Sequence, residues 1–201
     1  MVVAASRYRA SEADRAAEQL CSGGSLMFVK DFIDEYARYR AMGEKAMAQV
    51  SDEGLNRVVA PDGNSIAMIV RHISGNLVSR FSDFLTADGE KPSRNRDGEF
   101  ADGSFARGEI DTAWKRGWSA LDTALASLDE NDLTRIITIR GNEHTVHEAL
   151  CRSLSHTASH IGQIVLLARI VATDQWKWIT IPKGQSNQYN QNPTLEKRPA
   201  S

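Results

Sequence analysis

The stretch VHEALCRSLSHTASHIGQIVLLARIV, from Val146 to Val171, decides the fold because it is long, free of proline and apolar along one face. Its apolar side chains recur every three or four residues, the period of one face of an α-helix. They are Leu150, Leu154, Ile161, Ile164 and Ala168. This pattern predicts a long helix with one face in a protein core.

Three more segments share this helical period. They cover about residues 25–50, about residues 62–84 and about residues 105–128. Asp62 or Asn64 is placed to cap the second segment, because short polar side chains accept hydrogen bonds from free helix N–H groups. Four amphipathic helices predict an all-α fold, which we interpret as an up-down four-helix bundle. Trp114 and Trp118 share the apolar face of the third helix, so we expect both in the core.

A different period precedes the last helix. The segment TRIITIRGNEHTV, which starts at Thr134, has β-branched residues on both sides of Gly141-Asn142. This pattern predicts a short β-hairpin with its turn at those two residues. We therefore divide the chain into an N-terminal extension (1–24), the bundle with its hairpin (25–182) and a polar C-terminal tail (183–201).

Composition narrows the class of protein. The 201 residues are 41% hydrophobic and 25% charged, with a net charge of -2, which is typical of a soluble globular domain. Such a charge favours neither nucleic acid nor an anionic membrane as a partner. No apolar run reaches the roughly 20 residues of a membrane span, and the first residues lack the pattern of a secretory signal. Two cysteines, Cys21 and Cys151, make no disulfide framework, so we expect a cytoplasmic protein.

One charged segment, KPSRNRDGEF from Lys91 to Phe100, contains the densest group of basic residues. Asp97 and Glu99 interrupt the positive charges. We interpret the segment as a solvated loop rather than a phosphate-binding patch.

The long helix carries two histidines where core residues are expected. His156 and His160 are four residues apart, so they project about 40° apart on one helix face, at the edge of the apolar stripe. Two imidazoles at this spacing can chelate one metal ion. The alternative is a pair of core or capping histidines whose hydrogen bonds are satisfied inside the protein. Thr157 occupies the position where a zinc protease motif has its glutamate.

A third histidine, His72, lies in the second helical segment at the inner edge of its apolar stripe. One histidine from one helix and two from another is a common way to build a metal site inside a bundle. Three imidazoles leave a coordination position open, which is typical of catalytic sites, and they suit zinc, nickel, iron or manganese. We expect His144 and His147 to lie at the surface.

Three polar residues are placed to support such a site. Asn76 follows His72 by one helical turn and could orient an imidazole or contact a ligand. Arg80, one turn further on, either binds a substrate carboxylate or phosphate or makes a salt bridge between helices. Gln163 follows His160 by three residues and could support its imidazole. No carboxylate stands at helical spacing beside the histidines, so no general base can be assigned.

At these residues the chain resembles the DinB-like superfamily of metal-dependent bundle proteins, and most of all a branch of unknown function. The resemblance rests on IVRHISGNLVSRFSDFLTADGEKPSRNRDGEF from Ile69, on HTASHIGQIVLLARI from His156 and on WITIPKGQS from Trp178. It covers about residues 25–190. It implies a four-helix bundle in which His72, His156 and His160 bind a divalent metal ion.

Some members of this superfamily are thiol transferases that use low-molecular-weight thiols such as mycothiol or bacillithiol. With the histidine triad as motivation, we expect a metal-dependent enzyme of the thiol-transferase or hydrolase kind that acts on a small molecule. Two alternatives remain open: a non-enzymatic metal-binding or stress-response bundle, and a structural bundle without metal. The apolar segment WKWITIP after the last helix closes one end of the bundle or crosses to a second subunit, so a homodimer is also an expectation.

Overall fold

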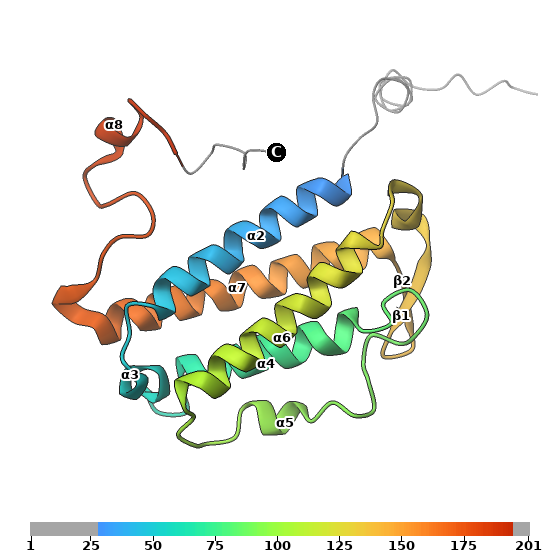
Figure 1. Ribbon diagram of the computed structural model, residues 1–201, viewed down its shortest axis with the longest axis horizontal. Helices are drawn as coiled ribbons and strands as arrows, with labels where there is room; N and C mark the ends of the chain where they lie inside the picture. Colours follow the sequence, from blue (N-terminus) through green and yellow to red (C-terminus); the bar gives the residue numbers. More distant parts are fainter. Residues whose placement is uncertain (1–27, 195–201) are drawn as a thin grey trace, which may run out of the picture.

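The computed structural model describes residues 28–194, which form a mostly helical fold with one small two-stranded sheet (Figure 1). The long helices are α2 (Phe28–Met47), α4 (Ile66–Phe81), α6 (Arg107–Ala126) and α7 (Val146–Ala172). The shorter elements are α3 (Asp52–Asn56), α5 (Arg96–Glu99), α8 (Ser186–Tyr189), the 3-10 turns η1 (Glu130–Thr134) and η2 (Thr173–Gln175), and the strands β1 (Ile136–Ile139) and β2 (Asn142–Thr145). Each long helix coincides with a segment that the helical period predicts. The predicted extension over residues 1–24, with Cys21, lies outside the described residues.

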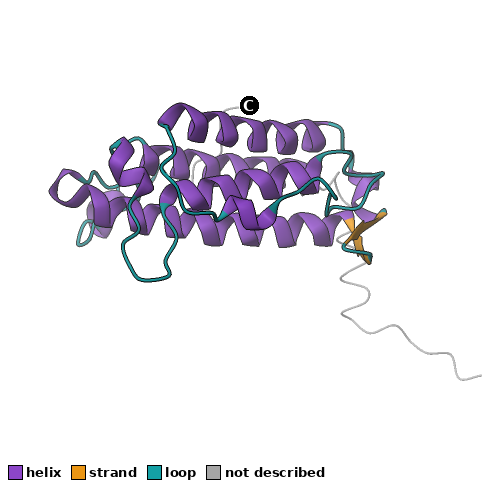
Figure 2. Cartoon of the chain, turned by 90° about the horizontal axis from the view of Figure 1, so that it is seen from below, coloured by secondary structure: helices purple, strands orange, loops and turns teal. Residues whose placement is uncertain are grey.

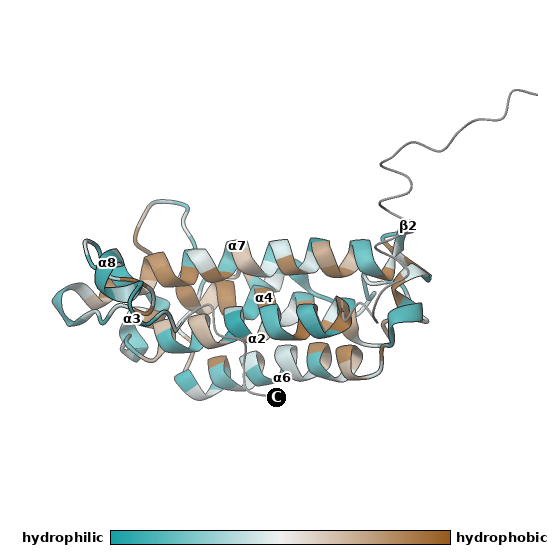
Figure 3. Ribbon diagram, turned by 90° about the horizontal axis from the view of Figure 1, so that it is seen from above, coloured by the Kyte–Doolittle hydropathy of each residue, from teal (hydrophilic) through white to brown (hydrophobic). Residues whose placement is uncertain are grey.

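The long helices lie side by side, with the sheet at one end (Figure 2). Teal and brown alternate along each of them in Figure 3, as amphipathic helices require. The buried side chains come from all four, and α4 is buried most extensively because it packs against both α6 and α7. Trp114 and Trp118 are buried, as their spacing predicts.

The order of the helices differs from the predicted up-down alternation. Helices α2 and α7 run in one direction, and α4 and α6 both run in the other (Figure 1). The reason is the connection over residues 82–106, which carries α5 back along the molecule before α6 begins. Arg71, near the start of α4, bonds to the Ala101 carbonyl and stacks on Phe105, just before the start of α6.

The cap of helix α4 is Ser65, one residue after Asn64 and three after Asp62, the two predicted caps. The Ser65 hydroxyl accepts a hydrogen bond from the backbone N–H of Met68 at 3.2 Å, so Ser65 is the cap rather than Asp62 or Asn64. Asp62 instead has a φ of 55° in a turn that precedes the helix. Which residue caps the helix therefore depends on where that turn ends. The residue types alone do not determine the end of the turn.

The predicted hairpin is present, but its turn is shifted by one residue. Ile139 pairs with Asn142, which leaves Arg140 and Gly141 as the turn residues, with φ angles of 54° and 73°. Two positive φ angles are the signature of a type I′ turn. Glycine adopts this conformation freely, whereas Arg140 needs support from outside the hairpin.

Asp88, at the start of the connection, gives that support. Its carboxylate accepts hydrogen bonds from the backbone N–H groups of Arg140 and Gly141, each at 2.8 Å, and from the N–H of Glu90 at 2.7 Å. The N–H groups of Gly141 and Glu90 hold the pKa of Asp88 well below its ordinary value. The hairpin is thereby fixed to the chain that leaves α4.

The apolar segment after α7 folds back on the end of α2. The backbone N–H of Lys177 donates to the Gln49 side chain at 2.6 Å, and the Gln49 amide donates to the Lys177 carbonyl at 3.1 Å. The Arg169 guanidinium stacks on Trp178. Within one chain the segment therefore closes an end of the helical body. None of the described helices combines the length and hydropathy that crossing a membrane requires.

The close contact of α4 and α6 can be tested at Gly117, because a Cβ atom there would lie 2.7 Å from the Cα of Ser74. We expect Gly117→Ala to push the two backbones apart and to lower the free energy of unfolding by about 1–3 kcal/mol. Gly162, in the interior of α7, has open space around its Cα. Gly162→Ala should raise stability by about 0.5–1 kcal/mol through helix propensity. Urea unfolding of both variants measures the difference, and shifts of the same sign would contradict this account of the interface.

Candidate metal centre

Three histidines converge between α4 and α7. Their ligand nitrogens, one from each of His72, His156 and His160, all lie within 4.8 Å of one another. The Nε2 atoms of His72 and His156 are 3.1 Å apart. For comparison, two nitrogens bound to one tetrahedral zinc ion at 2.0–2.1 Å lie about 3.3 Å apart. The three imidazoles are therefore close enough to share one ion.

The three side chains differ in burial. His72 is 4% exposed, whereas His156 and His160 are partly exposed. His72 thus forms the inner wall of the site, and the two α7 histidines form its outer edge.

A buried carboxylate orients the inner histidine. Nδ1 of His72 lies 2.9 Å from Oε2 of Glu99, which is 8% exposed. Glu99 also accepts two hydrogen bonds from Arg94, whose Nε lies at 2.8 Å and whose Nη2 lies at 2.9 Å. Since Nδ1–H donates to Glu99, the lone pair of Nε2 faces the other two histidines. This carboxylate–imidazole pairing is the usual outer support of a histidine metal ligand.

The connection between α4 and α6 delivers Glu99 to this position. Asn95 caps α5 by accepting a hydrogen bond from the Gly98 N–H at 2.9 Å, and Glu99 follows at the end of that short helix. Its side chain lies against the backbone at Gly75, where a Cβ atom would come 2.7 Å from Cδ of Glu99. A glycine at position 75 is therefore needed for the carboxylate to reach His72.

The interpretation of KPSRNRDGEF as a solvated loop is wrong for these two residues. The side chain of Arg94 is only 4% exposed and Glu99 is buried. Charge pattern alone misleads here because the two residues neutralise each other inside the protein. Two features of the sequence could have pointed to Glu99. Asn95 and Gly98 have the spacing of a helix cap, and a histidine that binds a metal through one ring nitrogen usually donates its other N–H to an acceptor such as a carboxylate.

The second nitrogen of His160 is also held. Its Nδ1 lies 2.8 Å from Oε1 of Gln163, one turn further along α7. An amide oxygen can only accept, so Nδ1 of His160 carries the proton and Nε2 has the free lone pair. Gln163, proposed from sequence as a supporting residue, thus contacts the histidine it was expected to support.

The other two sequence candidates have different environments. Asn76 is 9% exposed, and its side-chain amide makes no hydrogen bond to any residue that the structure describes. Arg80 donates to the carbonyl of Gly89 and to Oε2 of Glu90. Its contacts are thus an ion pair and a backbone bond to the connection after α4.

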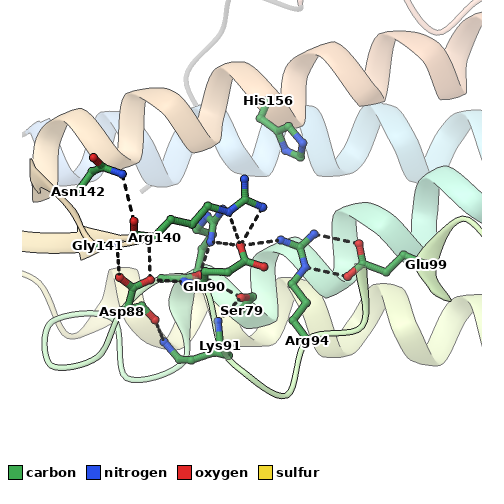
Figure 4. Close-up of polar contacts among 12 residues, drawn as sticks. Ser79, Asp88, Glu90, Lys91, Arg94, Glu99, Arg140, Gly141, Asn142 and His156 are labelled. Carbon is green, nitrogen blue, oxygen red and sulfur yellow. Dashed lines mark hydrogen bonds and ion pairs between the residues drawn. The ribbon is translucent and has the colours of Figure 1, made fainter. Parts of the chain in front are cut away.

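Positive charge gathers beside the histidines. Oε2 of Glu90 accepts from Arg80 at 3.0 Å, from Arg140 at 3.3 Å and from Arg94 at 3.5 Å. Figure 4 shows Arg94 and Arg140 meeting at Glu90, with the ring of His156 pointing toward this group. One carboxylate oxygen is shared by three guanidinium groups. Glu99 balances Arg94, but Arg80 and Arg140 share the single charge of Glu90, so the group keeps a surplus of positive charge.

Burial and neighbouring charges favour the neutral forms of His156 and His160. Burial, and then the charges of the other histidines and of Arg94 and Arg80, lower the pKa of His156 to about 4. Burial and the charge of His72 also lower the pKa of His160, against the opposing effect of Gln163. Burial raises the pKa of Glu99, but hydrogen bonds from His72 and Arg94 and the charge of Arg94 outweigh it, so the pKa lies below its ordinary value. Neutral imidazoles beside an ionised carboxylate are the protonation states that bind a metal ion.

The remaining histidines lie outside the cluster, but of the two predicted at the surface His147 is exposed and His144 is half-buried. His147 is exposed, with its ring against Phe28 and Phe32 and its Nε2 atom 3.9 Å from Sγ of Cys151. His144 is on β2, paired with Ile137. Among the described residues, the ligand atoms of His72, His156 and His160 are close enough to hold one ion, and His144 and His147 are not part of this group.

The role of Glu99 can be tested by charge removal. We expect Glu99→Gln to weaken zinc affinity by about 10–100-fold, because His72 loses the anionic partner that orients it and raises its basicity. Competition with a chromophoric chelator measures the affinity. Asp97→Asn, an exposed substitution on the same short helix, is the matched control and should bind zinc like the wild type. Equal affinities in all three proteins would show that Glu99 does not support the centre.

The lowered pKa of His156 predicts a pH dependence for protein stripped of metal by a chelator. The unfolded chain takes up a proton near pH 6.5, but folded His156 resists it down to about pH 4. This contribution to stability is thus complete above pH 6.5 and is lost as pH falls from 6.5 toward 4. We expect His156→Ala to flatten the decline of the urea midpoint across that window, and His147→Ala to leave it unchanged. A decline equally steep in the His156 variant would contradict the assignment.

Comparison with known proteins adds a family. Neither the curated proteins nor the solved structures contain a match to this chain. One family profile, described as protein of unknown function (DUF1572), matches residues 24–185. The matched region includes His72, Glu99, His156 and His160, and it spans most of the sequence. The chain therefore belongs to the DUF1572 family of proteins of unknown function.

Proposed function

We propose that the chain is a DinB-like four-helix bundle that binds a divalent metal ion through His72, His156 and His160. We further propose that it uses this ion for thiol transfer or hydrolysis of a small molecule. The observation that carries the proposal is the convergence of three ligand nitrogens within 4.8 Å, the innermost imidazole being held by a buried carboxylate. Histidines that served only for packing would not need an ionised partner at that depth.

The donor set fits the ion. Imidazole nitrogen is a good ligand for zinc, nickel, iron and manganese, and the lowered pKa values of His156 and His160 make these two available at neutral pH. Three protein ligands on a partly exposed edge agree with a catalytic site better than with a closed structural one. When bound, a divalent ion supplies Lewis-acid chemistry that makes a thiol or a water molecule more acidic.

The protein's own side chains complete the site around the ligands. Glu99 and Gln163 fix the ring orientation of His72 and His160 through their Nδ1 atoms. The positive charge of Arg80 and Arg94, which lowers the pKa of His156, also favours an anionic substrate group or a thiolate at the same place. Asn76 lies one turn from His72 with an amide that no described residue satisfies, so we propose that it hydrogen-bonds the substrate.

A second candidate is a metal-binding bundle without catalysis, for example a stress-response protein. The hydrogen bonds and the lowered pKa of Glu99, the carboxylate that contacts His72, favour this candidate. Both of its oxygens accept hydrogen bonds, and its pKa is lowered, so it is a poor general base. Activity would then require the ion and the substrate to supply all of the proton chemistry.

Elemental analysis of untagged protein tests the metal site. We expect about one divalent ion per chain, since three imidazoles form one centre. The His156→Ala/His160→Ala double variant should lose the ion because it removes two of the three ligands. The matched control is His144→Ala/His147→Ala, which removes two histidines outside the cluster and should keep the ion. Absence of metal from the wild type, even after incubation with zinc or nickel, would overturn the proposal.

Activity separates the two candidates once metal is found. The metal-loaded protein is mixed with bacillithiol or mycothiol and an electrophilic acceptor, and separately with chromogenic esters. Turnover that disappears in His160→Ala while the fold is retained supports the enzyme. A bound ion without any metal-dependent turnover supports the non-enzymatic candidate.

A further inference from the structure

A cavity of about 620 Å³ lies between α4, α6 and the connection that carries α5. Figure 1 shows this connection running alongside the two helices. Arg94 and Glu99 contribute to the cavity wall, but none of the three histidines does. Its volume is within the range of small-molecule sites, roughly 300–1,000 Å³. The cavity is thus separate from the metal centre and shares one wall with it.

The charges on the cavity wall do not balance. Basic side chains come from all three walls: Arg71 from α4, Lys91 and Arg94 from the connection, and Arg116 from α6. Arg94 is neutralised by Glu99. Arg71 instead bonds to the carbonyls of Gly98 and Ala101, and Lys91 bonds to the carbonyl of Asp88. These partners are neutral, and neither Arg71 nor Lys91 makes an ion pair in the described part of the chain, although the charges of Asp83 and Asp88 act on Lys91 from nearby.

Further polar groups of the wall have no partner among residues 28–194. The side chains of Arg116, Ser82 and Ser93 line the cavity and make no hydrogen bond or ion pair with any described residue. They belong to α6, to the end of α4 and to the connection, so their donors surround the space from different sides. Asp83 is the other acidic residue of the wall beside Glu99, and it is exposed.

We propose that this cavity binds a small phosphate monoester. A phosphate group has three acceptor oxygens in a tetrahedral arrangement and close to two negative charges, which suits donors on several walls. A carboxylate is planar and has two oxygens, so it would use fewer of these donors. Val78 and Ala113 add apolar surface for the organic part of the ligand. The proposal does not rest on the metal centre.

Isothermal titration calorimetry of the full-length protein tests the site, with glycerol 2-phosphate, inorganic phosphate and succinate as probes. We expect saturable binding of the two phosphates, and binding of succinate at least tenfold weaker. The His156→Ala/His160→Ala variant should bind glycerol 2-phosphate like the wild type, since neither histidine lines the cavity. Loss of binding in that variant would assign the phosphate to the metal centre and overturn the proposal.

Variants of the wall locate the ligand. Arg116→Glu should weaken binding of glycerol 2-phosphate at least tenfold, and Ala113→Phe should do the same by filling the cavity without a change of charge. Arg152→Glu is the matched control: Arg152 is an exposed arginine on α7 without an ion pair in the described residues, and the substitution changes net charge equally. Equal weakening by Arg116→Glu and Arg152→Glu, no saturable phosphate binding, or succinate as tight as glycerol 2-phosphate would each overturn the proposal.

Discussion

The buried contact of His72, Glu99 and Arg94 is the interaction on which the rest of the candidate site depends. Removing an ionised group from water costs several kcal/mol unless a partner of opposite charge and good geometry replaces the water. Here Arg94 supplies the opposite charge and two hydrogen bonds to the carboxylate of Glu99, and His72 supplies a third hydrogen bond. Each group therefore needs the other two, and the connection between α4 and α6 is fixed to α4 at this point. The orientation of the innermost histidine is a consequence of how that connection folds.

The direction of the helices explains why such a connection exists. Since α4 and α6 run parallel, the chain must return along the molecule between them, and residues 82–106 cover that distance. A short turn between antiparallel helices would have no room for α5, for Glu99 or for Glu90. The same segment holds the hairpin through Asp88, whose carboxylate supports the positive φ angle of Arg140. One crossover thus joins the sheet, the arginine group and the histidines.

Sequence reasoning could predict the parts that depend on neighbours along the chain. The four long helices and the pairing of His156 with His160 follow from a period of three to four residues, and His72 follows from its place on an apolar stripe. The parts it missed depend on contacts between distant residues. Glu99 is 27 residues from His72, and its segment has the charge pattern of a solvent-exposed loop. The hairpin turn moved to Arg140 because Asp88, 52 residues earlier, stabilises a conformation that arginine rarely adopts. The parallel order of α4 and α6 cannot be read from periodicity, which carries no information on direction.

The acidic residues near the histidines are all engaged in holding the structure. Glu99 supports His72 and Arg94, Glu90 is shared by three arginines, and Asp88 binds the backbone of the hairpin. Basic residues outnumber acidic residues on both sides of α4: on one side beside His156, and on the other side in the cavity. This distribution leaves the imidazoles of His156 and His160 neutral and surrounds them with positive charge. Such a site is suited to binding anions and a cationic metal ion held by neutral nitrogens, and it is poorly suited to proton abstraction by a side-chain carboxylate. If the proposed metal-dependent reaction takes place here, its proton would come from a thiol, a substrate or a water molecule made more acidic by the ion, since these carboxylates are engaged in holding the structure.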